Sequence, residues 1–120
     1  SAMSTPPDPD DFLPLPPTDF QLLLILLSGP RHAYGITQAA EEEERSGVGL
    51  GIGSLYRMLA RLKERGFLEE GSELESASGG PRRKMYRITE LGVAVARAEA
   101  ARLRNMLELA DERLQLAERR

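Results

Sequence analysis

Arginine side chains at helical spacing are the feature of this sequence best suited to chemistry. In segment 53–67, Ser54, Arg57 and Arg61 recur every three or four residues, so a helix would carry them on one arc. Another arc is apolar and consists of Leu55, Met58, Leu59 and Leu62. Because a guanidinium group can donate two hydrogen bonds to guanine, the polar arc suits the major groove of duplex DNA. An amphipathic helix with solvated arginines is the alternative.

The first half of this segment supplies the expected contacts with bases. Ser54 and Arg57 are the candidates for base edges, Arg57 through a bidentate bond to guanine. Arg61 lies one turn later and is expected to meet phosphate. Tyr56 is a candidate for phosphate contact through its hydroxyl group, with a core position as an equal alternative. Gly53 would let the backbone approach DNA closely, or would serve only the tight entry to the helix.

A second group of cations follows a loop. Segments 67–75 and 83–88 are expected to be strands, and segment 76–81 between them has the serine, glycine and proline content of a loop. Two strands with a long loop would form a wing suited to phosphate or minor-groove contact, unless the loop is only incidentally basic. The base of this wing carries Arg82, Arg83 and Lys84.

Two helices are expected to position the arginine-bearing segment. Segment 18–28 begins with the spacing of a capping box at Thr18 and Gln21 and is apolar almost all round. Such a helix must be covered on several sides, in the middle of the domain or at a subunit interface. Leu22 and Leu26 are assigned to that interface.

The second of these helices is expected over 33–45, with the glycine-rich link 46–51 after it. Helix, short link and helix is the order of a helix-turn-helix motif. We assign Tyr34 to the core in preference to the DNA backbone. His32 has no partners at metal-binding spacing, so it is expected to cap or pack.

A long last helix is expected from Thr89, a natural N-cap, to about residue 118. At about 45 Å it is too long for so small a domain to cover, so it needs a partner, most simply a second copy of the chain. Apolar residues along it alternate at spacings of four and three, which is a heptad seam. The seam, assigned to a homodimer interface, contains Ala96, Ala100, Leu103, Leu107, Ala110, Leu114 and Ala117.

Composition indicates one globular domain, since 41% of the 120 residues are hydrophobic and 29% are charged. The chain has no cysteine and no arrangement typical of catalysis, so we expect no enzyme, metal or cofactor. The longest apolar run, 22–27, is far shorter than the roughly 20 residues of a membrane helix. A soluble protein of the cytoplasm is expected.

Charge and proline are unevenly distributed. The net charge is -3, but segment 57–87 is basic, and local potential decides phosphate binding, so DNA binding should depend strongly on salt. Segment 1–17 holds most of the prolines and is expected to be a disordered or extended arm, of which 1–3 looks like the remnant of a tag.

The sequence resembles the short members of the PadR-like family of bacterial transcriptional regulators. The segments that carry the resemblance are 29–35 (GPRHAYG), 53–56 (GSLY) with Leu59, Arg61, Leu62 and Gly66, and 79–92 (GGPRRKMYRITELG). The resemblance implies a winged helix-turn-helix, a dimer through the last helix and repression at a palindromic operator. Some members release DNA on binding phenolic acids or hydrophobic drugs. The chain lacks the tryptophan that drug-sensing members place in the dimer pocket.

The expected fold is therefore mainly α with a small antiparallel β wing. A winged helix-turn-helix domain would occupy 18–88 and a dimerisation helix 89–120. The expected function is a sequence-specific DNA-binding regulator, a repressor that binds double-stranded DNA as a homodimer. The alternatives are a winged-helix module that binds other proteins, and a sensor that takes a small aromatic effector at the dimer interface.

Overall fold

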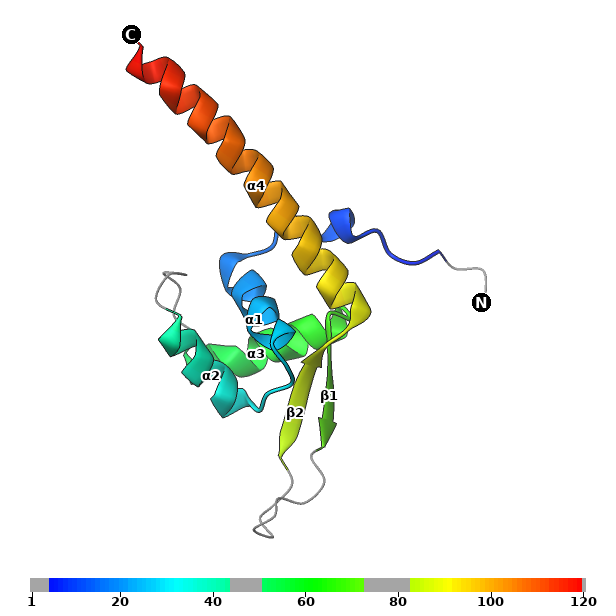
Figure 1. Cartoon of the computed structure of the whole chain (residues 1–120). Coiled ribbons are helices and arrows are strands. Elements are labelled where there is room, and N and C mark those ends of the chain that lie inside the picture. The colour runs from blue at the N-terminus through cyan, green and yellow to red at the C-terminus, as the bar shows by residue number, and fades with distance from the viewer. Residues whose placement is uncertain (1–4, 44–50, 73–82, 120) are drawn as a thin grey trace.

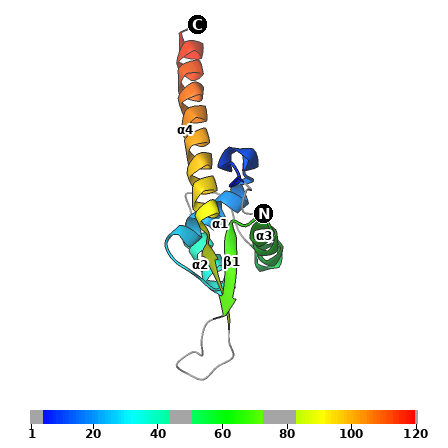
Figure 2. The same cartoon turned by 90° about the vertical axis from the view of Figure 1, so that its right-hand side faces the viewer.

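Short helices and a hairpin gather around the base of one long helix in the computed structural model, which describes residues 5–43, 51–72 and 83–119 (Figure 1). The elements are η1 (Pro9–Phe12), α1 (Pro17–Leu27), α2 (Ala33–Glu42), α3 (Ile52–Glu64), β1 (Leu68–Ser72), β2 (Lys84–Ile88) and α4 (Glu90–Glu118). The hairpin points away from the domain on one side, and α4 projects on the other (Figure 2). This arrangement agrees with the expected fold class.

Helix α1 forms the centre of the core and packs against α2, α4 and β2. Leu22 and Leu26 are 0% and 1% exposed within the single chain, so they belong to its own core and not to a subunit interface, which corrects our assignment. Ala96 of α4 is likewise buried, at 3%. A sequence that is apolar all round predicts burial, but it cannot tell burial inside one chain from burial between two.

The start of α1 also differs from the expected one. The helix begins at Pro17, its N-cap is Pro16, and no side chain caps it, so Thr18 and Gln21 do not form the capping box. Proline at the first helical position explains the shift, because its missing N–H is one that the helix would leave unpaired in any case.

The proline-rich segment before α1 is packed against the domain, contrary to the loose arm that we expected for it. Phe12 is the last residue of η1 and packs edge to face on Phe67, with ring centroids 4.9 Å apart. Leu15 is 4% exposed, and its backbone N–H donates to Glu99 of α4 over 3.2 Å. The Glu99 carboxylate also accepts two hydrogen bonds from Arg102, at 2.6 and 3.0 Å. The burial of a few apolar side chains therefore orders this segment despite its disorder-promoting composition.

The ends of α3 and of the hairpin depend on local backbone geometry. After α3, Gly66 adopts φ 84°, a left-handed conformation that favours glycine, and the chain turns into the fully buried Phe67. Strands β1 and β2 are antiparallel, with Leu68 opposite Ile88 and Ser72 opposite Lys84. Residues 73–75 of the expected first strand, the loop 76–81 and the link 46–50 lie outside the described residues.

Helix α4 confirms the expected last helix in both position and length. It runs for 29 residues, and the Thr89 side chain caps it by accepting from the Gly92 N–H over 3.0 Å. Its buried residues all lie near its beginning, from Gly92 to Glu99. Beyond Arg102, six large hydrophobic side chains are 40 to 62% exposed: Leu103, Met106, Leu107, Leu109, Leu114 and Leu116.

In the described ranges 5–43, 51–72 and 83–119, none of the helices is long and apolar enough to cross a membrane. The same ranges contain no group of three or more histidine, cysteine, aspartate or glutamate side chains that could hold a metal ion.

Candidate nucleic-acid interface

The polar arc of α3 lies on the surface, as its spacing predicted. Gly53, Ser54, Tyr56 and Arg57 are all exposed, Tyr56 by 55%. The apolar arc is buried and consists of Leu55, Met58, Leu59 and Leu62. Within the part of the chain that the structure describes, Arg57 makes no ion pair, so its guanidinium group is available for an external anion.

Arg61, unlike Arg57, forms an ion pair within the described part of the chain. Its Nη2 atom lies 2.5 Å from Oδ1 of Asp19, a residue of α1 whose side chain is 0% exposed. Arg61 itself remains 41% exposed. A carboxylate in the first turn of an apolar helix was the signal in the sequence, because a buried acid needs a cation nearby. No sequence pattern indicated which cation that would be.

Cations of the hairpin lie close to α3. Arg83 and Lys84 are exposed, and Arg82 lies outside the described residues. The Glu70 carboxylate of β1 sits between two ammonium groups, with Oε1 at 3.4 Å from Nζ of Lys63 and 3.7 Å from Nζ of Lys84. Lys63 therefore joins the candidate residues, although the arginine pattern of α3 had not singled it out.

A hollow of about 490 Å³ separates α3 from the hairpin. Tyr56 and Lys63 line it from α3, and Glu70, Lys84 and Tyr86 line it from the two strands. Side chains from both predicted cationic segments thus meet around one concave surface. Glu64 and Glu70 also line this surface, so its two lysines are the groups that could meet a phosphate backbone passing between a helix and a wing.

The start of α2 joins the base of the hairpin. Arg31 and Tyr86 exchange backbone hydrogen bonds of 3.0 and 2.9 Å, and Nδ1 of His32 lies 3.0 Å from the carbonyl oxygen of Lys84. Tyr34 is 69% exposed, which corrects its assignment to the core. Tyr34 is exposed because it lies on the outer arc of α2. The buried positions of this helix are Ala33, Ile36, Thr37 and Ala40.

Tyr86 gives the interface a measurable response to pH. Burial, aided by the nearby Glu70 carboxylate and Tyr56, raises the pKa of the Tyr86 hydroxyl above its usual value of 10.0. The folded chain therefore keeps this proton at a pH where the unfolded chain has lost it, so stability should fall as pH rises above about 10. We expect Tyr86→Phe to reduce this fall in urea denaturation midpoints measured between pH 9 and 11.5. Equal slopes for the two proteins would contradict the assignment.

A comparison with models of protein families identifies the family of this chain. The model of the transcriptional regulator PadR-like family matches residues 22–98, from α1 into the first part of α4. The chain belongs to the PadR-like family. This membership confirms the resemblance seen in the sequence, and it assigns the protein to a family of transcriptional regulators and not of enzymes. No curated protein matches the sequence.

Solved structures with the same fold include other PadR regulators. A PadR family transcription regulator from Clostridium difficile has a TM-score of 0.67 and 27% identity, with 80% of this chain and 96% of that chain covered. A PadR-like transcription factor from Bacteroides fragilis has a TM-score of 0.65 and 26% identity, with 79% and 87% covered. Bacillus subtilis PadR, solved in complex with operator DNA, has a TM-score of 0.59 and 22% identity, with 68% and 46% covered.

Proposed function

We propose that this PadR-like protein binds DNA as a homodimer and represses transcription from a palindromic operator. The observation that carries the proposal is the meeting of Tyr56 and Lys63 of α3 with Lys84 of the hairpin around one hollow. The similar fold of Bacillus subtilis PadR, solved with operator DNA, supports it. As a regulator acting on DNA, the protein would work in the cytoplasm.

The proposed contacts are of two kinds. Ser54 and Arg57 would read base edges in the major groove. At Gly53 no atom stands within 4 Å of the place that a Cβ would take, so the backbone could approach DNA closely. Phosphate contacts would come from Tyr56, Lys63 and Lys84, which line the hollow, and from Arg82 and Arg83, which precede Lys84 in the sequence.

The homodimer would form along the projecting part of α4. Leucine and alanine residues provide the seam, and Leu107 and Leu114 are each 62% exposed in the single chain. A two-fold axis through this seam would present two copies of α3 to DNA, which is why the proposed operator is palindromic. The seam residues proposed to lie at the interface are Ala100, Leu103, Leu107, Ala110, Leu114 and Ala117.

Replacing Arg57 by alanine tests the base contact. We expect a loss of about 1–3 kcal/mol in binding free energy on the cognate site and a smaller loss on random DNA. The site is first obtained by selection from random sequences, and affinity is then measured by fluorescence anisotropy at several salt concentrations. Arg113→Ala, which removes an equal charge far along α4, is the matched control and should change neither affinity. Unchanged cognate affinity for Arg57→Ala would exclude the proposed contact.

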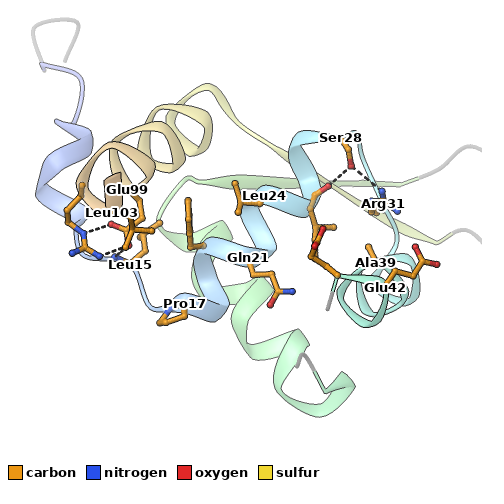
Figure 3. Close-up of a pocket in the computed structure, with 14 residues that line it drawn as sticks. Leu15, Pro17, Gln21, Leu24, Ser28, Arg31, Ala39, Glu42, Glu99 and Leu103 are labelled. Atoms are coloured by element: carbon orange, nitrogen blue, oxygen red, sulfur yellow. Dashed lines mark hydrogen bonds and ion pairs between the residues drawn. The ribbon is translucent and has the colours of Figure 1, made fainter. Parts of the chain in front are cut away.

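A second candidate function, sensing of a small aromatic acid, is favoured by a second and larger hollow. This hollow has a volume of about 920 Å³ and lies between the N-terminal arm, α1, α2 and α4 (Figure 3). Its lining combines apolar side chains with charged ones, and it includes Leu15, Phe20, Leu24, Arg31, Arg102 and Leu103. Hydrogen bonding to Glu99 raises the pKa of Arg102, which stays cationic and could meet a carboxylate. A ligand that binds here would raise the thermal midpoint in a screen of aromatic acids, and no shift would count against sensing.

A further inference from the structure

Asp19 is a fully buried acid that forms a hydrogen bond with Arg61 of α3. Its side chain is 0% exposed, and Oδ1 accepts from Nη2 of Arg61 over 2.5 Å. Oδ2 has no hydrogen-bond partner within the described ranges. A buried carboxylate without a cation is strongly unfavourable, so Arg61 must stay beside Asp19 for the fold to keep its stability.

Arg61 links buried Asp19 to the surface of α3 that is proposed to face DNA. It follows Arg57 by four residues, so the two side chains lie on neighbouring turns of the same arc of α3. The buried leucines of α3 hold the helix to the core and set which face is turned inward. A guanidinium–carboxylate bond is short and directional, so it adds a sharper restraint on the rotation of α3 about its own axis. Because Arg57 shares this arc, the same restraint limits the direction in which Arg57 points.

We propose that Asp19 is a positioning residue for DNA recognition, which acts through Arg61 to set the rotation of α3 and the direction of Arg57. The inference rests on the proposed function, because it concerns the same interface. It reassigns Arg61 from the phosphate contact that its spacing suggested to a link between α1 and α3. Asp19 itself, being buried, never touches DNA.

Two variants test the link by different routes. Asp19→Asn keeps the shape of the side chain and removes its charge, whereas Arg61→Lys keeps the charge and loses the planar donor geometry. For both we expect the ratio of cognate to random affinity to fall about tenfold, within the range that one bidentate base contact contributes. Affinity for random DNA should not fall, because it depends on the total charge facing the phosphates.

The alternatives give different results in the same measurement. If Arg61 bound phosphate directly, Asp19→Asn would release it and strengthen binding to both DNAs, with an unchanged ratio. If the pair only stabilised the fold, both affinities would fall by one factor, as expected for Ile36→Val, a control that weakens the core of α2. Either result overturns the inference. A wild-type chain that binds no DNA at low salt would instead reject the proposed function.

Discussion

Replacing Gly92 by alanine should lower the free energy of unfolding by about 3 kcal/mol, the upper end of the usual cost of overpacking. Gly92 lies in the first turn of α4, and a Cβ placed there would stand 2.0 Å from the carbonyl oxygen of Phe67 and 2.7 Å from Cγ1 of Ile88. That carbonyl also accepts from the Thr89 N–H over 3.0 Å, so it cannot move without loss of the contact that joins the hairpin to α4. Chemical denaturation of both proteins at one concentration measures the difference.

Gly53→Ala is the matched control for this substitution. Gly53 also lies within a helix, but nothing stands within 4 Å of the place a Cβ would take. Alanine there should raise stability by about 0.5–1 kcal/mol, because it restricts the unfolded chain and favours the helix. If Gly92→Ala matched the wild type or the control in stability, α4 could not lie directly on the Phe67 carbonyl.

Charging the outer seam of α4 should separate the proposed dimer and weaken operator binding about 100-fold or more. The variant is Leu107→Glu with Leu114→Glu, two side chains that are each 62% exposed, so the fold of the single chain should be unaffected. The loss in affinity follows because one copy binds one half-site, and the gain from linking two half-sites disappears. Sedimentation velocity and fluorescence anisotropy measure the two effects.

A control on the same helix separates the seam from general polarity. Leu109→Glu with Leu116→Glu adds the same two charges at positions 44% and 55% exposed, each two residues after a predicted seam position. This variant should remain a dimer with unchanged operator affinity. Equal effects of the two double variants would show that the dimer does not form along the predicted seam. A monomeric wild-type protein would reject the proposed dimer itself.

The elements that could be predicted are those specified by neighbours in the sequence. Thr89 marks the start of α4 because capping is a contact across three residues, and the α3 arc follows from helical periodicity alone. The wing was predicted from two strand-like segments on either side of a loop-like one, and the family resemblance implied the same fold. What could not be predicted is which element meets which: periodicity shows that a face is buried, but not whether the partner is the same chain.

Specific pairings show where sequence reasoning failed. Arg61 looked like a phosphate ligand by its spacing, and only the fold brings it to Asp19, 42 positions earlier. The same holds for the N-terminal arm, where Phe12 and Leu15 dock on surfaces made by residues far along the chain. Tyr34 was misassigned for the opposite reason, since an aromatic residue in a short helix is buried only if it falls on the inner arc.

The bond between Leu15 and Glu99 spans 84 positions, which determines when the arm can settle. On a ribosome adding about 5–20 residues per second, the arm emerges roughly 4–17 seconds before its docking surface exists. During that interval Leu15 remains exposed to solvent. It reaches its buried position only after the first turns of α4 have been synthesised.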